Sequence, residues 1–320
     1  MAEKDLLSVV IPCYKSEKTI SSVIEKEMRI FEENGISRYE FILVNDCSPD
    51  HTWETLKALG HKYPFVKCIN LSKNVGQHGA IMAGFNHVSG DLVVLSDDDG
   101  QTQMEAIGQM MACLETGYDV VMADTSFTHE KRSFVRRTGT KLNDAVSNVL
   151  LDNPKKTVLS IFFLARRFVI DEVVRYKNPY PYITGLVLRA THNIGVVKVE
   201  HLSRMEGTSG YTFKKLFSLW TNGMTAFSIV PLRIAAYIGF ISALIGILYG
   251  IYLVVRKLII PTSITAGWSS TVAIVLLMSG IILCVLGVIG EYLGRIYMCI
   301  NNAPQYIIRD TVNLNDRGDA

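Results

Sequence analysis

The chain has 320 residues, which is enough for one large domain or two modest ones. Its formal net charge is only +2, so the charge balance does not indicate a nucleic-acid-binding protein, and we expect no nucleic-acid partner. Hydrophobic residues make up 49% of the chain and charged residues only 19%, which is more apolar than a soluble enzyme usually is.

The first strands and helices are predicted from alternating apolar runs and helical patterns. Five apolar runs predict strands, at 6–11, 39–45, 65–71, 92–95 and 119–123. We expect Pro12 to end the first strand. The segments between the strands predict helices, at 17–34, from Ser48–Asp50 onward, from about 79 to 88, and at 104–115. This alternation predicts an α/β fold with a mostly parallel, doubly wound sheet and helices on both faces.

Three aspartates, Asp97, Asp98 and Asp99, follow the buried strand at 92–95. In an open parallel sheet, ligands bind outside the carboxyl ends of the strands. The alternate carboxylates of Asp97 and Asp99 suit a divalent cation that also holds substrate phosphates. A solvated turn in which Asp99 caps the next helix is the other interpretation, and the triplet alone leaves both open.

The pattern changes after Thr125, where a polar segment spans residues 127–137. It carries four cations, at Lys131, Arg132, Arg136 and Arg137. Such a loop could close over a phosphorylated substrate, or it could be an ordinary solvated loop. A helix at about 138–151 and short strands at 160–165 and 195–200 are expected to follow.

Two uncharged runs, at 234–255 and about 268–290, are each long enough to cross a bilayer. We assign transmembrane helices to 231–257 and 268–294, joined by an extracytoplasmic loop at 258–267. The cationic residues that flank the two spans outnumber Arg256 and Lys257, which lie between them. By the positive-inside rule, residues 1–210 are therefore expected in the cytosol. Six scattered cysteines without a C-x-x-C pair, and the absence of a signal peptide before or within the run Leu6–Ile11, agree with that side. A buried helical hairpin of a soluble core is the alternative.

Residues 211–230 place aromatic residues and leucines at helical spacing beside lysines, which predicts an amphipathic helix in the headgroup layer. A similar pattern at 297–308 leads us to assign residues 295–320 to an interfacial helix and a cytosolic C-terminal tail. A packed core helix remains the alternative for both segments.

Five stretches together resemble a known enzyme family. They are Ser8–Tyr14, Asn45–Ser48, Asn74–Phe85, the D-x-D-x-Q motif Asp97–Gln101, and Gly290–Tyr297 at the end of the second span. The chain resembles, from Ser8 to about Arg309, the membrane-anchored glycosyltransferase family 2 enzymes that make polyprenyl-phosphate sugars, which include dolichol-phosphate mannose synthase. The resemblance implies a GT-A-type, Rossmann-like catalytic domain followed by the two-helix hairpin.

The resemblance also implies donor-binding residues. Asp46 would accept a hydrogen bond from the nucleobase, and Pro12 and Tyr14 would line that pocket. Lys73 and Asp98 would complete this side of the donor site.

Other residues would handle the phosphates. Asp97 would face the ribose and metal region, while Asp99 and Gln101 would ligate Mg²⁺ or Mn²⁺. Arg136 or Arg137, together with Arg204, would grip the phosphates of the donor or the lipid. We accordingly expect Asp97, Asp99, Arg136 and Arg204 to carry catalysis.

The implied reaction is an inverting, metal-dependent transfer of a sugar from a nucleotide sugar to a polyprenyl phosphate at the cytosolic face of the cytoplasmic membrane. A UDP-sugar donor, an undecaprenyl phosphate acceptor and a use in cell-envelope glycan modification are expected from bacterial members. Some relatives form tetramers, so a homo-oligomer is a possible state. The acceptor is already an anion, so no strong general base is needed.

The chain departs from the family pattern in several places. Asn45 replaces the first of two usual aspartates, Gln103 and Met104 replace prolines, and Gly210 stands where lysine is common. His78 either begins its helix or has a catalytic role. Glu291 either forms an ion pair with Arg295 or contacts the lipid.

Two rival functions remain to be weighed. A processive polysaccharide synthase would carry Q-x-x-R-W, but no arginine precedes Trp53, Trp220 or Trp268. A catalytically inactive membrane scaffold, or a partner in flipping lipid-linked sugar, is the alternative of another class. The intact Asp97, Asp99 and Gln101 argue against it.

Overall fold

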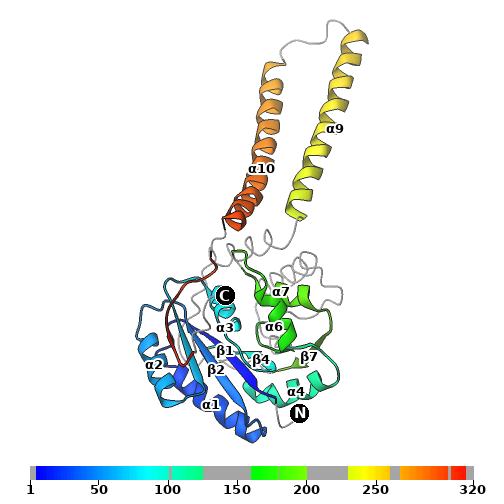
Figure 1. The fold of residues 1–320 in the computed structure, drawn as a ribbon. Helices are drawn as coiled ribbons and strands as arrows, with labels where there is room; N and C mark the ends of the chain where they lie inside the picture. Colours follow the sequence, from blue (N-terminus) through cyan, green and yellow to red (C-terminus); the bar gives the residue numbers. More distant parts are fainter. Residues whose placement is uncertain are drawn as a thin grey trace. The chain divides into compact units, whose positions relative to one another are not determined.

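The computed structural model describes residues 5–100, 103–124, 160–179, 181–199, 230–259, 267–301 and 304–314 (Figure 1). The chain divides into two units, one formed by residues 1–213 with 302–320 and the other by residues 214–301. The first is an α/β unit built on one sheet, and the second contains two long helices.

The sheet has eight strands in the order β7-β5-β6-β4-β1-β2-β3-β8. Their bounds are β1 Leu7–Cys13, β2 Tyr39–Asn45, β3 Val66–Leu71, β4 Leu92–Leu95, β5 Val120–Asp124, β6 Phe163–Arg166, β7 Ile194–Lys198 and β8 Ile308–Val312. Among the described strands, β6 and β8 alone run against the direction of the others, because β6 pairs antiparallel with β4 and β5, and β8 pairs antiparallel with β3. The expected mostly parallel α/β sheet is confirmed.

Helices cover both faces of this sheet (Figure 1). They are α1 Ile20–Glu33, α2 Thr52–Lys62, α3 Gln77–Phe85, α4 Ile107–Glu115, α6 Arg167–Val174 and α7 Ile183–Ala190, with a 3₁₀ turn, η1, at Met104–Ala106. Alternate strand residues such as Val9 and Ile11 join α1, α2 and α4 in one core cluster. On the other face α3 packs closely over Val10, because a Cβ on Gly84 would lie only 2.5 Å from the Val10 Cγ1 atom. Helices α6 and α7 were not predicted.

The prediction that Pro12 ends the first strand is wrong, because β1 continues to Cys13. Pro12 pairs in register with Val44 of β2. The backbone carbonyl of Val10 accepts a hydrogen bond from the Ser96 N–H, so the backbone groups of Val10 face β4. Pro12 lies two residues later in the same strand, so its backbone groups face the same side. The pairing of β1 with β4 ends at Val10, so the backbone N–H that Pro12 lacks has no β4 carbonyl to bond.

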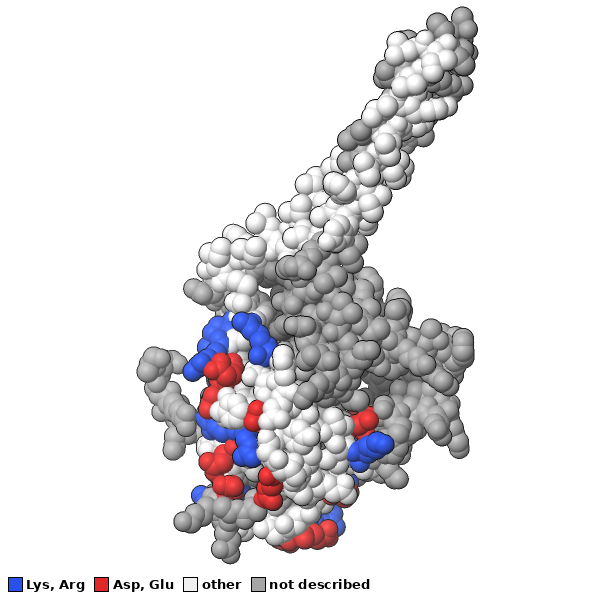
Figure 2. All heavy atoms as spheres, turned by 90° about the vertical axis from the view of Figure 1, so that its right-hand side faces the viewer, with Lys and Arg blue, Asp and Glu red and all other residues white. Residues whose placement is uncertain are grey.

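The second unit contains α9, Val230–Ile259, and α10, Trp268–Ile300. Both expose large apolar side chains, such as Phe240 at 69% and Leu283 at 68%. On the face shown in Figure 2, the described part of these helices presents no charged side chain. Among the described residues, one stretch, Leu277–Gly294, is long and apolar enough to cross a membrane by length and composition, and α9 holds a shorter apolar stretch, Ala235–Gly246.

The C-terminal segment differs from its prediction as an interfacial helix and tail at 295–320. Residues up to Ile300 continue α10, but Ile308–Val312 form β8, an antiparallel edge strand on β3. The intervening Pro304 cannot continue a helix, and the free backbone groups at the edge of β3 accept a strand there. The predicted interfacial helix is therefore wrong for residues 304–308, and residues 309–312, predicted only as tail, belong to β8.

Several predictions fall on residues outside the described ranges. These are the basic loop at 127–137, the helix at 138–151, the amphipathic helix at 211–230 except its last residue, and most of the loop at 258–267. They stay predictions.

Candidate active site

The candidate site lies where β1, β2, β3 and β4 end side by side at the carboxyl edge of the sheet. Each of these parallel strands leads into a polar loop, and the described parts of the four loops are residues 14–19, 46–51, 72–76 and 96–100. Neighbouring parallel strands bring such loops together at one edge. The hydrogen bonds between these loops determine which side chains are held and which face a substrate.

Asp98, the middle residue of the acidic triplet, anchors the loop after β1. Its Oδ2 atom accepts hydrogen bonds from the backbone N–H of Tyr14, at 2.9 Å, and from the Ser16 hydroxyl. Burial raises the pKa of the Asp98 carboxyl, although the hydrogen bonds from Ser16 and Tyr14 act in the opposite direction. We therefore place Asp98 in the framework of the site and not among the metal ligands.

Asp97 and Asp99 flank this anchor and are both half-buried. The Oδ1 atom of Asp97 accepts a hydrogen bond of 3.2 Å from the side-chain amide of Gln77, the first residue of α3. The helix-cap interpretation of Asp99 is not supported, because η1 has Gln103 at its N-cap position and no side-chain cap bond. Gly100 follows with a φ of +73°, a left-handed conformation that favours glycine and turns the chain away from the strand.

Asp46 is buried at the end of β2 and holds the loop after β3. Its two carboxylate oxygens accept hydrogen bonds from the backbone N–H groups of Val75, at 2.7 Å, and Gly76, at 2.9 Å. Burial raises the pKa of the Asp46 carboxyl to about 6, and these two hydrogen bonds offset the increase only in part. Each oxygen keeps a second lone pair, so the carboxylate can still accept a hydrogen bond from a nucleobase.

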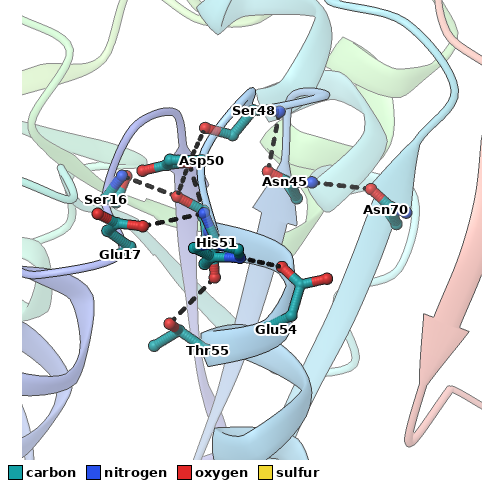
Figure 3. Close-up of polar contacts among 10 residues, drawn as sticks. Ser16, Glu17, Asn45, Ser48, Asp50, His51, Glu54, Thr55 and Asn70 are labelled. Carbon is teal, nitrogen blue, oxygen red and sulfur yellow. Dashed lines mark hydrogen bonds and ion pairs between the residues drawn. The ribbon is translucent and has the colours of Figure 1, made fainter.

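A compact set of hydrogen bonds orders the loop after β2 (Figure 3). The Asn45 Oδ1 atom accepts from the backbone N–H of Ser48, at 3.2 Å, and the Ser48 hydroxyl accepts from the backbone N–H of Lys15, at 2.8 Å. Ser48 also donates to Asp50, which accepts a 2.7 Å hydrogen bond from the Thr52 hydroxyl. Although burial acts to raise it, the hydrogen bonds from Ser48 and Thr52 hold the pKa of Asp50 below its ordinary value.

Two residues of these loops adopt the left-handed backbone conformation without being glycine. They are Lys15, with a φ of 60°, and Cys47, with a φ of 50°. Each such residue costs about 1 kcal/mol or more, which the surrounding contacts must offset.

The structure brings most of the predicted donor residues to this edge. Those at the carboxyl ends of β1 to β4 are Pro12, Tyr14, Asp46, Lys73, Asp97, Asp98 and Asp99. Tyr14 is 46% exposed, so its ring is open to a ligand, and Lys73 is exposed in the loop after β3. Gln101, Arg136, Arg137 and Arg204 lie outside the described residues, and their roles stay predictions.

Glu27 lies behind the acidic triplet and was missed in the sequence. It is 2% exposed, and its Oε1 atom accepts a 2.6 Å hydrogen bond from the hydroxyl of Ser96, the residue before the triplet. Its Oε2 atom is buried and has no hydrogen-bond partner among the described residues. Burial raises the pKa of Glu27 to about 8, so it is largely protonated at neutral pH. The sequence did carry a signal, because Glu27 falls on the apolar stripe of α1 with Ile24 and Phe31.

His78 is the second residue of α3, whose N-cap position is Gly76. Its ring meets that of Tyr182 edge-on at 5.3 Å between centroids, and its Nδ1 atom has no partner within the described ranges. Burial lowers the pKa of His78 to about 4, so the ring is neutral. His78 therefore lies in the first turn of α3, as the first of its two interpretations predicted.

The donor set at this edge fits a hard divalent cation. Asp97 and Asp99 supply carboxylate oxygens, which Mg²⁺ and Mn²⁺ prefer, and nucleotide phosphates and water ordinarily complete such a shell. Asp98 is committed to the loop after β1. Over the described parts of the chain, no group of three or more His, Cys, Asp and Glu side chains could hold a metal ion.

Comparison with known proteins identifies the family of the chain. The family model described as glycosyl transferase family 2 matches residues 8–174, and the one described as GtrB C-terminal hairpin matches residues 230–296. The chain is 32% identical over 310 residues to an undecaprenyl-phosphate 4-deoxy-4-formamido-L-arabinose transferase from Proteus mirabilis, covering 96% of this chain and 94% of that protein. It is 30% identical over 306 residues to the SfII prophage-derived bactoprenol glucosyl transferase from Shigella flexneri, covering 95% and 97%.

A solved structure supports the fold. The chain is similar to glucosyl-3-phosphoglycerate synthase from Mycobacterium tuberculosis, crystallised with Mn²⁺, UDP-glucose and phosphoglyceric acid. The TM-score is 0.51 at 17% identity, over 69% of this chain and 78% of that one. On the family models and the near full-length relatives, the chain belongs to glycosyltransferase family 2 and is a glycosyltransferase.

Proposed function

We propose that the chain transfers a sugar from a nucleotide sugar, of the UDP-sugar class, to undecaprenyl phosphate at the cytosolic face of the membrane. The proposal rests on one observation: the same chain contains a sheet edge that carries the carboxylates of Asp97 and Asp99 and a pair of long helices with exposed apolar side chains. The names of the two relatives above, for undecaprenyl-phosphate and bactoprenol transfer, support it. The product would serve cell-envelope glycan modification.

The nucleoside end of the donor would lie against the loops after β1 and β2. The half-exposed ring of Tyr14 offers a surface for a base, and Pro12 lines the same strand end. Asp46 is held rigid by two backbone amides, so its remaining acceptor capacity would be fixed in direction for an N–H of the base. Lys73 lies in the adjoining loop after β3.

The diphosphate would lie beside the acidic triplet. Asp97 and Asp99, with Gln101, would hold Mg²⁺ or Mn²⁺. When bound, such a cation offsets the negative charge that grows on the leaving nucleoside diphosphate. Arg136, Arg137 and Arg204 are our candidates for further phosphate contacts, since a guanidinium matches phosphate geometry.

The reaction requires little proton transfer by the protein. The lipid phosphate is an anion at neutral pH, so one of its oxygens can attack the anomeric carbon directly. The new carbon–oxygen bond forms as the bond to the nucleoside diphosphate breaks, and displacement from the opposite side inverts the configuration. The protein's contribution is to orient two anions and to reduce their repulsion.

The two-helix unit would keep the acceptor within reach. Helices α9 and α10 are 30 and 33 residues long, and a span of about 20 residues crosses the hydrocarbon core. Exposed apolar side chains over this length are suited to lipid and not to water. We propose two spans, at 231–257 and 268–294, with the sheet unit on the cytosolic side. A homo-oligomer, such as a tetramer, is part of this proposal.

A donor panel tests the reaction and the sugar together. Membranes that contain the chain would be incubated with undecaprenyl phosphate and labelled nucleotide sugars, with and without EDTA. We expect lipid labelling from one donor, lost with EDTA and lost in Asp99→Asn. Asp91→Asn, which changes an exposed carboxylate at the opposite end of β4, should retain activity. If no donor labels the lipid, an inactive scaffold or flipping partner becomes the better account.

A further inference from the structure

The C-terminal segment Gln305–Asn313, which we call the strap, is bound along the edge of the sheet beside the donor loops. The Gln305 side-chain amide donates to the backbone carbonyls of Tyr176, at 2.8 Å, and Asn178, at 2.7 Å. At its other end the Asn313 amide donates to the carbonyls of Gly60, at 2.6 Å, and Val66, at 2.9 Å. The strap is therefore fixed at both ends by side chains as well as by the β3 pairing.

Between these ends the strap carries one half of a polar row that crosses the sheet. Asn45, Asn70 and Asp310 are cross-strand neighbours in the registers of β2, β3 and β8. The Asn45 amide donates to the Asn70 Oδ1 atom at 2.8 Å, and the Asn70 amide donates to the Asp310 Oδ2 atom at 2.9 Å. Figure 3 shows Asn70 beside Asn45 and the loop of Ser48.

The row continues into the loops that hold the donor site. The Asn45 Oδ1 atom accepts from the Ser48 N–H, and Asn45 directly precedes Asp46. A second contact runs through the backbone, since the N–H of Ser72 donates to the Ile307 carbonyl at 2.9 Å. Ser72 opens the loop whose amides hold the Asp46 carboxylate. Both routes lead from the strap to Asp46.

We propose that the strap is part of the donor site, and that Asp310 is a positioning residue that acts through Asn70 and Asn45 on the Asp46 loop. This inference rests on the proposed function. Asn45 and Asn70 are 3% and 7% exposed, so each amide needs its partners from the protein. Asp310 supplies the acceptor at the end of the row. Without it the Asn70 amide loses its acceptor and is free to turn, which removes the oxygen that Asn45 requires.

The direction of the hydrogen bonds gives a sharp test. In Asn45→Asp the new carboxylate cannot donate, so Asn70 must turn its amide toward residue 45 and its oxygen toward the Asp310 carboxylate. Two acceptors then face each other. In the double variant Asn45→Asp/Asp310→Asn, the amide at 310 donates to Asn70, which donates to residue 45, so the row is complete again with its polarity reversed.

The readout is the KM for the nucleotide sugar against kcat, measured on the full chain with undecaprenyl phosphate. The Asp310 side chain is about half exposed. We expect Asp310→Ala to raise the donor KM about fivefold with little change in kcat, as for the loss of about 1 kcal/mol. Asp310→Asn, which keeps an acceptor, should raise it less. Asn45→Asp should raise it at least as much as Asp310→Ala, and the double variant should recover most of that loss. Thr311→Ala, on the exposed part of the same strand, is the control.

Amide hydrogen exchange on the same variants, without any ligand, separates this inference from the proposed function. We expect faster exchange at residues 46–50 and 72–76 in Asp310→Ala and Asn45→Asp, and recovery in the double variant. Unchanged exchange, or a double variant worse than Asn45→Asp in donor KM, would overturn the inference and leave the transferase proposal standing. If the unaltered chain transfers no sugar, the proposed function and the donor role fail together, while the exchange pattern still reports whether the row orders the loops.

Discussion

The buried Glu27 predicts an unusual dependence of stability on pH. Burial raises the pKa of its carboxyl from 4.5 to about 8 in the folded chain, with smaller contributions from the hydrogen bond of Ser96 and the nearby Lys26, which lower it, and from Asp97. Between those two pH values the folded chain keeps a proton that the unfolded chain has lost. The free energy of unfolding therefore falls as pH rises, by about 1.4 kcal/mol per unit and about 5 kcal/mol in total.

Glu27→Gln removes this titration and keeps the shape of the side chain. The amide oxygen can still accept from the Ser96 hydroxyl, and the NH₂ group replaces a carboxyl oxygen that has no partner among the described residues. The variant should gain stability over the unaltered chain as pH rises, by about 2 kcal/mol between pH 6 and pH 8, because the slope flattens as the pH approaches the folded pKa of Glu27. For a unit of this size that corresponds to on the order of 5–10 °C in Tm.

The assay is thermal unfolding of the full chain in detergent at several pH values. Glu25→Gln is the matched control, because Glu25 lies on the same helix with its side chain 54% exposed. The raised pKa of Asp46 adds a further pH slope, but it is common to all three proteins and cancels in the differences. A Tm difference between Glu27→Gln and the unaltered chain that stays constant with pH, or a variant less stable at pH 8, would refute the reasoning.

Three further predictions follow from the packing and the site. Gly84→Ala should lower the free energy of unfolding by about 2 kcal/mol, because the new methyl group overlaps the Val10 side chain. Thermal unfolding measures the change, and Gly246→Ala is the control because a Cβ at Gly246 would have no neighbour within 4 Å. An unchanged Tm for Gly84→Ala would contradict the packing. Asp98→Ala should raise the donor KM by more than about tenfold, since the loop of Tyr14 loses a half-buried carboxyl acceptor worth about 2 kcal/mol. A donor KM within twofold would show that the anchor is dispensable. Dialysis against EDTA should abolish sugar transfer and added Mn²⁺ or Mg²⁺ should restore it, whereas full activity in metal-free buffer would exclude the proposed cation.

Local sequence patterns were sufficient to predict most of the sheet. The second strand was predicted at 39–45, the bounds that β2 has, because its apolar run ends abruptly at polar residues. Strand β8 could not be predicted in this way. Only two of its five residues, Ile308 and Val312, are half-buried, and its partner β3 lies more than two hundred residues earlier. Helices α6 and α7, with eight residues each, are too short to give a clear helical period.

The location of the candidate site was also predictable, but the hydrogen bonds of its aspartates were not. The acidic triplet follows a buried strand, and that order alone places it at the carboxyl edge. Which carboxylate is an anchor depends on loops that meet only in the folded chain, as with Asp98 and Ser16, which are 82 residues apart. The same holds for Asp46 and the amide of Gly76. The presence of Asn45 in place of the usual aspartate could be explained only from the structure, where the Oδ1 atom of Asn70 accepts a hydrogen bond that an aspartate could not donate.

The most direct test of the central claim identifies both products of one turnover. The purified chain would be given undecaprenyl phosphate and a UDP-sugar labelled in the sugar and in the β-phosphate. The account predicts one UDP released for each sugar attached to lipid, with the β-phosphate label remaining on UDP. Release of UMP with the β-phosphate on the lipid, or release of UDP with no sugar on the lipid, would contradict it.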